Sequence, residues 1–393
     1  MEIINRGMRY FIPITCPFCF DKFSFRELLF RCINPNCRGR EADDIYARAW
    51  GFTAATAMGK ILHPRYPPSL LSRSHSMRCS QCEEATTKLI CPRCHHDLPD
   101  AGLINQRSIA IIGGSNTGKS HYIAVLIRRL KREVGPNFQF SVSEYGDETR
   151  TRYKREFEMP LFTQKTIIQI TPPAQNDPQV RTPLIFRIIF HGKWRNRVLN
   201  LYFFDTAGED MKSHDTLGRF YPYITNAHGI IFLLDPLQIE RVREQLPASQ
   251  YPRMIDPLAD PEYIVGRVRE LFEQRKSVPF AQKIRVPIAF TLSKIDVIQS
   301  LIPEDSMLHS LSEHYGRLNV ADVDALSEEI EALLCDWINP SFCLDIKNKF
   351  KSYRYFGVSS LGKAPEGGRV PVVRPRRIEE PFLWIMYKLG FIE

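Results

Sequence analysis

The sequence predicts an α/β fold with a mostly parallel sheet, preceded by two small modules that each bind a metal ion through four cysteines. Three features support this prediction. Short apolar runs alternate with helical stretches from about residue 107 onward, a pattern typical of an open sheet with helices on both faces. A glycine-rich turn follows the first apolar run. Eight of the ten cysteines form four close pairs within the first hundred residues.

Composition and hydropathy exclude several classes of protein. The chain has 393 residues, of which 44% are hydrophobic and 25% charged, so we expect one large globular domain plus smaller ones. No apolar run is long enough to span a membrane, and the N-terminus lacks the features of a signal peptide, which favours the cytoplasm. The net charge of +9 leaves nucleic acid or a membrane surface open as a partner, but we favour a mildly basic surface because 44 acidic residues are interspersed.

Six apolar runs predict the strands of the large domain, which we expect to cover residues 107–393. The predicted strands are 108–113, 184–191, 198–205, 228–235, 286–294 and 353–360. The predicted helices are 119–134, 236–246, 261–276, 323–338 and 379–392. Two long stretches, 236–285 and 299–352, are predicted as charged helical insertions. Surface helices in such places either dock partners or elaborate the core, and the sequence leaves both interpretations open.

The cysteine pairs predict two structural zinc sites, because a reducing compartment disfavours disulfides and four thiolates suit tetrahedral zinc. The first predicted zinc ribbon, at 1–58 with a helix at 44–58, uses Cys16, Cys19, Cys32 and Cys37. The second, at 79–98 after a linker at 59–78, uses Cys79, Cys82, Cys91 and Cys94. Iron–sulfur ligation and unligated thiols are the alternatives.

The sequence leaves open the roles of four further residues, two histidines beside the last cysteine pair and two cysteines far along the chain. His95 and His96 directly follow Cys94, so one of them could replace a thiolate, although histidines so placed are more often exposed neighbours. Cys335 and Cys343 stand apart from the pairs and are expected to be buried free thiols.

The segment GGSNTGKS, 113–120, fits the phosphate-binding pattern G-x-x-x-x-G-K-S between a strand and a helix. Glycines let successive N–H groups point at phosphate oxygens, and the helix N-terminus adds partial positive charge. Lys119 is expected to reach the terminal phosphates as a catalytic group, and the Ser120 hydroxyl to bind Mg²⁺. The predicted contacts of this loop are Gly113, Ser115, Asn116, Thr117, Gly118, Lys119, Ser120 and His121.

The segment LYFFDTAGED places Asp205 at the end of an apolar strand, where its carboxylate can hold Mg²⁺ through water. Gly208 lies three residues on, so that its backbone N–H can approach a γ-phosphate. A phosphate loop followed by DTAG resembles the Ras-like GTPases. In those enzymes a glutamine follows the glycine and orients the attacking water; here the position is Glu209, which implies slow or partner-activated GTP hydrolysis.

Two later segments resemble the guanine-specificity motifs of the same family. FTLSKID, 290–296, supplies Ser293, Lys294 and Asp296, and the Asp296 carboxylate can accept both the ring N–H and the exocyclic amine of guanine. Ser293 departs from the usual asparagine or threonine. FGVSSLG, 356–362, resembles the last motif of the family, in which small residues let a backbone N–H reach the guanine oxygen. Its candidate residues are Ser359, Ser360 and Leu361. These motifs favour guanine over adenine.

The first switch threonine is not fixed by the sequence. Thr163, Thr166, Thr171 and Thr182 all lie in the long segment 158–186. We select Thr166 as the catalytic-site ligand because QKT follows a Pro-Leu turn as a mobile loop would. Thr182, directly before a strand, is the second choice.

The combination of zinc ribbons, CPRCHHDLP, the phosphate loop and DTAGED resembles the bacterial double-GTPase-type domains associated with conflict and phage-defence systems. The detailed resemblance covers 79 to about 235 and the tail from about 355. It implies a regulatory GTPase that binds GTP or GDP, Mg²⁺ and two zinc ions and controls a partner protein. Two other functions stay open: an ATP-dependent, ribbon-guided nucleic-acid protein, and a nucleotide-bound scaffold with little turnover, which Glu209 suggests.

Overall fold

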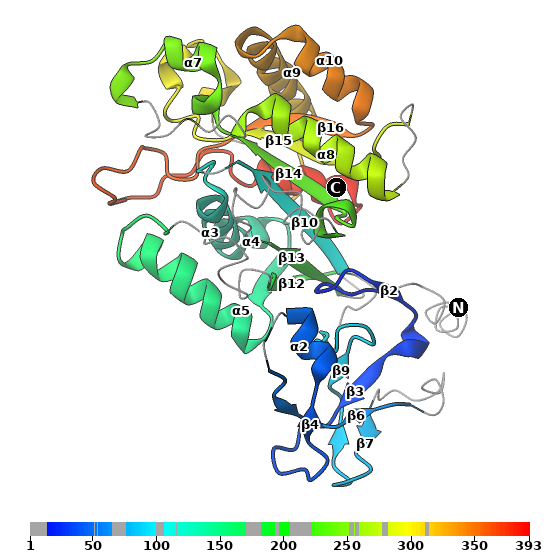
Figure 1. Cartoon of the computed structure of the whole chain (residues 1–393). Coiled ribbons are helices and arrows are strands. Elements are labelled where there is room, and N and C mark those ends of the chain that lie inside the picture. The colour runs from blue at the N-terminus through cyan, green and yellow to red at the C-terminus, as the bar shows by residue number, and fades with distance from the viewer. Residues whose placement is uncertain are drawn as a thin grey trace. The chain divides into compact units, whose positions relative to one another are not determined.

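The chain divides into two compact units, residues 1–106 with 198–200 and residues 107–197 with 201–393. The computed structural model describes residues 14–50, 52, 54–64, 76–99, 106–114, 116–169, 182–192, 196–204, 222–250, 255, 259–276, 282–310 and 314–393. We call the first part the cysteine unit and the second part the nucleotide unit (Figure 1).

The nucleotide unit is built on a seven-stranded sheet in the order β11-β12-β13-β10-β14-β15-β16. The strands are β10 (Gln106–Gly113), β11 (Phe140–Glu144), β12 (Leu184–Phe190), β13 (Arg197–Phe203), β14 (Gly229–Leu234), β15 (Ile288–Leu292) and β16 (Tyr353–Gly357). Strands β10, β14, β15 and β16 pair in parallel, and β11 pairs antiparallel with β12. The predicted α/β fold with a mostly parallel sheet is confirmed.

The central strands are buried on both faces, as parallel strands covered by helices should be. All residues of β14 and β15 are buried. Phe290 of β15 packs its ring against Phe232, Phe350 and Tyr355, with ring centroids 5.5–5.7 Å apart. This aromatic cluster forms the centre of the core between the last three strands.

Strand β11 was not predicted from the sequence. Its five residues, FSVSE, alternate with polar side chains, and of these only Phe140 is buried. The strand lies at the edge of the sheet, where one neighbour and one apolar residue suffice.

Helices α3 (Lys119–Arg129) and α11 (Glu380–Lys388) are neighbours, joined by an ion pair of 2.8 Å between Arg129 and Glu379. Helix α11 lies close against β14, because a Cβ on Gly229 would sit only 2.4 Å from Ile385 Cγ2. The helical path continues from α3 through a π-helical turn, η2 (Leu130–Val134), and α4 (Gly135–Asn137). After β11 come α5 (Asp147–Arg152) and the π-helical η3 (Tyr153–Thr163).

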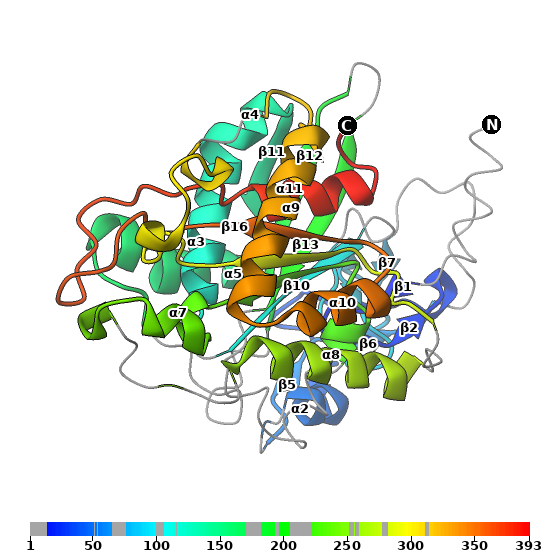
Figure 2. The ribbon, with the colours of Figure 1, turned by 90° about the horizontal axis from the view of Figure 1, so that it is seen from above.

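The stretch between β15 and β16 folds into helices that cover the outer edge of the sheet. It contains η9 (Gln299–Leu301), η10 (Met307–His309), α9 (Val320–Trp337) and α10 (Pro340–Lys349). On the open edge of β16, the Tyr355 N–H donates to Ser327 Oγ of α9 at 2.9 Å, so this edge does not offer a free hydrogen-bond donor there. Helices α9 and α10 lie side by side (Figure 2).

The stretch between β14 and β15 is also helical where it is described. It contains η6 (Pro236–Gln238), α7 (Glu240–Glu244), η7 (Ala248–Gln250) and α8 (Pro261–Lys276). Asn339 donates to the Glu262 carboxylate at 2.9 Å and so joins α8 to the start of α10.

The cysteine unit consists of short strands around a core of thiols and a few apolar side chains. Its strands are β1 (Ile14–Thr15), β2 (Lys22–Phe23), β3 (Leu29–Arg31), β4 (Glu41–Ala42), β5 (Ala57–Met58), β6 (Ile61–Leu62), β7 (Met77–Arg78), β8 (Ala85–Thr86) and β9 (Leu89–Ile90). They pair as the sheet β6-β3-β9 and the hairpins β1-β2, β4-β5 and β7-β8. Two short helices, η1 (Phe25–Glu27) and α2 (Asp44–Trp50), complete the unit.

Two sequence predictions for this unit need correction. Helix α2 ends at Trp50 instead of residue 58, because Ala57–Met58 forms β5 and pairs with β4. The predicted linker 59–78 contributes β6, which pairs with β3. Strand β3 also pairs with β9, so the two predicted ribbons share one sheet.

Candidate functional site

The phosphate loop joins the end of β10 to the start of α3, and its glycines are required by the backbone. Gly118, the N-cap of α3, has a φ of 87°, which favours glycine over other residues. A Cβ on Gly113 would lie 2.6 Å from Thr117 Oγ1 and 2.8 Å from the Leu233 carbonyl oxygen. The Thr117 hydroxyl donates to the Gly114 carbonyl at 3.0 Å and closes the loop. The sequence pattern therefore forms the tight turn that a phosphate cradle needs.

Lys119 is folded over this loop. Its ammonium group donates to the Gly113 and Gly114 carbonyl oxygens at 2.9 and 2.8 Å, and the residue is only 7% exposed. A buried cation at a helix N-terminus makes this the most electropositive point of the loop. Ser120 follows in the first turn of α3. Ser115 lies outside the described residues.

His121 connects α3 to the segment that follows η3. Its Nε2 accepts a hydrogen bond of 3.1 Å from the Ile168 backbone N–H. Burial, and next the positive charge of Lys294, lower the pKa of His121 to about 4. The ring is therefore neutral near pH 7, as the acceptor role requires. His121 was predicted to contact nucleotide, and this role stays a prediction.

The carboxyl ends of four parallel strands meet at one edge of the sheet. Gly113 lies opposite Leu233, Leu234 opposite Leu292, and Leu292 opposite Gly357. The phosphate loop and the two predicted base motifs begin at these strand ends, and ligands of open α/β sheets bind in this position. Asp205, Gly208 and Glu209 lie outside the described residues.

The two predicted guanine motifs contact each other directly. The Ser359 hydroxyl donates to Asp296 Oδ1 at 2.6 Å and accepts from the Gly362 N–H at 2.8 Å. The Ile295 N–H also donates to the Val358 carbonyl at 3.3 Å. The carboxylate of Asp296 is thus oriented by a side chain 63 residues away in the sequence. Ser360 and Leu361 follow in the same loop.

Lys294 has a partner that the sequence analysis missed. Its ammonium group donates to Asp235 Oδ2 at 2.7 Å, and Asp235 itself is buried at the end of β14. The signal was present, because Asp235 ends an apolar strand as Asp205 does. Ser293 donates its hydroxyl to the Leu234 carbonyl at 3.0 Å, so it ties the base motif to β14.

The candidate switch threonines occupy different surroundings from those expected. The Pro-Leu pair before Thr166 was interpreted as a turn, but Pro160 and Leu161 lie inside the helix η3. Thr166 donates its hydroxyl to the Pro160 carbonyl at 3.2 Å. Thr163 is the last residue of η3. Thr182 is buried, and its carbonyl accepts from Arg152 at 2.6 Å.

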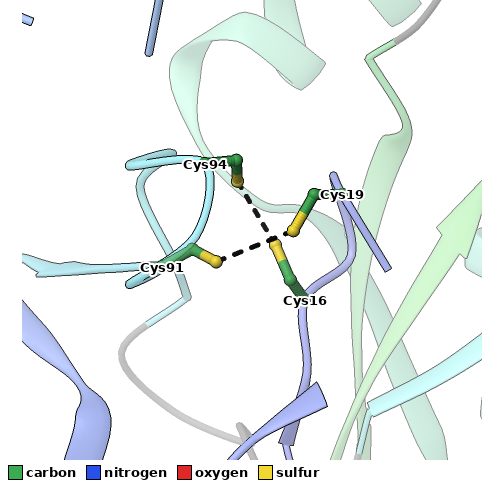
Figure 3. Close-up of side chains that lie close together, drawn as sticks. All are labelled: Cys16, Cys19, Cys91 and Cys94. Atoms are coloured by element: carbon green, nitrogen blue, oxygen red, sulfur yellow. Dashed lines mark hydrogen bonds between the residues drawn. The ribbon is translucent and has the colours of Figure 1, made fainter. Parts of the chain in front are cut away.

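The eight paired cysteines form two groups of four, but the predicted grouping is wrong. One group is Cys16, Cys19, Cys91 and Cys94, and the other is Cys32, Cys37, Cys79 and Cys82. The first pair in the chain therefore joins the last, and the two middle pairs join each other. Figure 3 shows the first group, whose four sulfurs point toward one another from two separate loops.

The spacing of the sulfurs fits zinc. Four sulfur–sulfur distances across the groups are Cys16–Cys94 at 3.7 Å, Cys19–Cys91 at 3.8 Å, Cys32–Cys82 at 3.6 Å and Cys37–Cys79 at 3.8 Å. Metal–sulfur bonds of about 2.3 Å in a tetrahedron place sulfurs about 3.8 Å apart. Burial raises the pKa of Cys32 to about 12 and that of Cys16 well above its ordinary value, whereas thiol contacts with Cys16 and Cys19 lower the pKa of Cys91. Four thiols packed this closely can ionise together only beside a cation.

The backbone around the cysteines has the shape of metal-binding loops. Backbone N–H groups of Phe18, Gly39 and Arg93 lie 3.4 Å from the sulfurs of Cys16, Cys37 and Cys91. The residue after each C-x-x-C pair adopts a left-handed conformation, with a φ between 55° and 63° at Phe20, Glu83 and His95. Such amide donors stabilise a ligating thiolate.

His95 and His96 belong to neither sulfur group, and both are buried instead of exposed. His95 Nδ1 lies 2.9 Å from Asp43 Oδ1, and Asp43 also accepts from Arg31 at 2.8 Å. The ring of His96 stacks on Phe18 with centroids 3.4 Å apart. Cys343, far from these sites, is a buried free thiol and Cys335 a half-buried one.

Comparison with known proteins identifies the family. Residues 107–337 match the Double-GTPase 2 family, and the chain belongs to it. The chain is also 27% identical over 398 residues to the putative ESX-1 scaffolding and assembly protein SaeC of Mycolicibacterium smegmatis, with 96% of this chain and 99% of that protein covered. Among the helices that the structure describes, none is long and apolar enough to cross a membrane.

Proposed function

We propose that the protein is a GTP-dependent switch that controls a protein partner. The observation that carries this proposal is that the phosphate loop and the predicted base motifs begin at one edge of the sheet. Lys119 lies in the phosphate loop, and Asp296 lies at the end of the neighbouring strands with its carboxylate held by Ser359. A cationic phosphate cradle and an oriented carboxylate for the base are what recognition of a guanine nucleotide requires.

The residues take separate parts in this proposal. Gly113, Thr117 and Gly118 shape the loop, and Lys119 would leave its two carbonyl partners to bind the terminal phosphates. Ser120 and Asp205 would hold Mg²⁺, which neutralises charge on the β- and γ-phosphates when bound. Asp296 would accept from the two N–H groups that guanine offers and adenine lacks on that edge.

We propose that turnover is slow unless a partner assists it. Glu209 stands where a Ras-like enzyme has glutamine. A carboxylate can accept a hydrogen bond from water, but it adds negative charge beside the γ-phosphate at which that water must attack, which slows hydrolysis without preventing nucleotide binding. Lys119 and Gly208 would then stabilise the transferred phosphate, with Thr166 as the candidate switch ligand.

Two basic stretches, RRLKR at 128–132 and RPRR at 374–377, could contact nucleic acid, but ion pairs within the protein favour a protein partner instead. In 128–132, Arg129 pairs with Glu379 and Lys131 with Glu144. In 374–377, Arg377 is buried between Asp322 and Glu380. Cations that are already paired with carboxylates are less available for phosphate contacts. The relative that matches 96% of this chain is a putative scaffolding and assembly protein. Control of assembly is therefore favoured over a role in phage defence.

Nucleotide binding by the purified protein tests the proposal. We expect GTP and GDP to bind and ATP not to compete. Lys119→Ala should weaken binding by about 10- to 100-fold, the loss expected for hydrogen bonds to a charged group. The exposed Lys363→Ala serves as the matched control, since Lys363 pairs with Glu366 on the surface. Displacement of GTP by ATP at equal concentration would contradict the proposal.

A further inference from the structure

The chain between β16 and α11, residues 359–376, forms a projecting hairpin that we call the arm. At its base, Ser359 and Arg376 exchange two backbone hydrogen bonds of 3.1 and 2.9 Å, and Arg374 N–H donates to the Leu361 carbonyl at 2.9 Å. The arm extends away from the sheet in both views (Figures 1 and 2). Its base therefore starts at the serine that holds Asp296.

The tip of the arm is a tight turn with a defined geometry. Glu366 and Arg369 exchange backbone hydrogen bonds of 3.2 and 2.9 Å. The two central residues, Gly367 and Gly368, have φ values of 55° and 76°. Two left-handed residues in a two-residue loop are the signature of a hairpin turn that matches strand twist.

Beyond this turn, the arm bonds to the segment that carries Thr166. Ile167 N–H donates to the Gly368 carbonyl at 3.0 Å, and Val370 N–H donates to the Lys165 carbonyl at 2.8 Å. Thr166 lies opposite Arg369 in this short antiparallel pairing. Val370 is buried, whereas Val372, two residues on, is 58% exposed. Val370 is thus a buried contact of the arm beside 165–167.

The opposite end of the same segment is held by the helix after the phosphate loop. The next residue, Ile168, donates its N–H to His121 Nε2 at 3.1 Å. His121 lies directly after Ser120 in the first turn of α3. Residues 165–168, which we call the clamped segment, are therefore bonded both to the phosphate-loop helix and to the arm.

We propose that the arm is a positioning element that restrains the clamped segment and links its place to the guanine loop. The link runs from Asp296 through Ser359 and the base of the arm to Gly368 and Val370. A movement of the clamped segment relative to the arm breaks these two hydrogen bonds. This inference rests on the proposed GTP-dependent function, and it adds the restraint that sets how readily the switch moves.

A shortened arm tests the inference with the full-length chain. Replacing residues 363–373 by a single Asn closes Leu361 onto Arg374 through a Gly-Asn turn. Gly362 stays in place, because a Cβ there would lie 2.2 Å from the Arg374 carbonyl oxygen, so the base of the arm and Ser359 are preserved. Hydrogen exchange of 164–168 should become about tenfold faster, as expected when two backbone hydrogen bonds are lost. Release of a fluorescent GDP analogue should accelerate by a similar factor of about ten.

Two control variants separate the backbone pairing from side-chain effects. Arg369→Ala and Val372→Ser keep both backbone hydrogen bonds, so exchange and release should match the wild type. His121→Ala should expose the Ile168 N–H alone and leave the arm pairing in place. Gln at position 121 offers an acceptor, so His121→Gln should restore protection of Ile168.

The possible failures are distinguishable. Unchanged exchange of 164–168 in the shortened variant would overturn the arm pairing. Faster exchange with unchanged GDP release would overturn the positioning role while leaving the proposed switch intact. A wild-type chain that binds no guanine nucleotide would overturn the proposed function, and the inference with it.

Discussion

The two units of this protein are stabilised by different means. In the cysteine unit most strands are two residues long, and the buried core contains sulfurs of both four-cysteine groups. In the nucleotide unit, strands of five to eight residues form one sheet whose centre is packed with aromatic rings. A short segment cannot bury enough apolar surface to fold alone, and a metal supplies the missing free energy. The comparison predicts that each unit fails by a different perturbation.

Zinc removal should have the largest effect, and it should act on the cysteine unit. A structural zinc site contributes on the order of 10 kcal/mol, so a chelator should unfold this unit while the seven-stranded sheet, which contains none of the eight ligands, persists. Circular dichroism and hydrogen exchange measure the unfolding of the cysteine unit and the persistence of the sheet.

The grouping of the cysteines, in which the first pair joins the last and the two middle pairs join each other, adds a sharper test. Cys16→Ser with Cys91→Ser should cost one zinc per chain. Cys79→Ser with Cys91→Ser should cost both, and one lost zinc in that variant would support consecutive ribbons instead.

A cavity in the aromatic core should have the next largest effect. Phe290 is fully buried among Phe232, Phe350 and Tyr355, so Phe290→Ala should lower the free energy of unfolding of the nucleotide unit by about 4 kcal/mol. Urea unfolding measures this change, and zinc content should stay at the wild-type value. Val372→Ala is the control, because truncating an exposed side chain leaves no cavity and should leave the free energy of unfolding almost unchanged. A loss below about 1 kcal/mol for Phe290→Ala would contradict the predicted packing.

Acid should destabilise the nucleotide unit through His121. Its pKa in the folded chain is lowered to about 4, mainly by burial, from the ordinary histidine pKa of about 6.5. The unfolded chain therefore binds the proton first as the pH falls between these values, and stability decreases over that window. The full loss is up to about 3 kcal/mol. His121→Gln keeps an acceptor for Ile168 and should flatten this dependence, which urea unfolding at pH 7 and pH 5 would measure. Equal pH dependence in both proteins would contradict it.

The sequence predicted the central strands because buried parallel strands are continuous apolar runs. It did not predict β11, whose single buried residue, Phe140, leaves too little apolar signal. Cysteine spacing predicted which thiols lie close together within a loop, but spacing says nothing of which loops meet. Which two loops share a metal depends on the strand pairing of β3 with β6 and β9, and nothing local in the sequence encodes that.

The candidate site likewise has a part that the sequence predicted and a part that it did not. Gly118, Lys119 and Asp296 were predicted because their chemistry imposes residue types at fixed spacing. The contact of the arm with 165–167 was not predicted, since backbone hydrogen bonds between Ile167 and Gly368 leave no signature in side-chain type. The prediction of a turn at Pro160 was wrong because η3 accommodates this proline within a helix. Local rules favour a break there, and the surrounding packing overrides them.

The most direct test of the guanine assignment is a change of nucleotide specificity at Asp296. Asparagine in place of aspartate offers an amide donor and suits a base with a carbonyl where guanine has its amine. Asp296→Asn should therefore weaken GTP binding and gain binding of xanthosine triphosphate, measured by titration calorimetry, while the exposed Asp305→Asn control binds as the wild type. An Asp296→Asn protein that still prefers GTP would contradict the account, because Asp296 would then not contact the base.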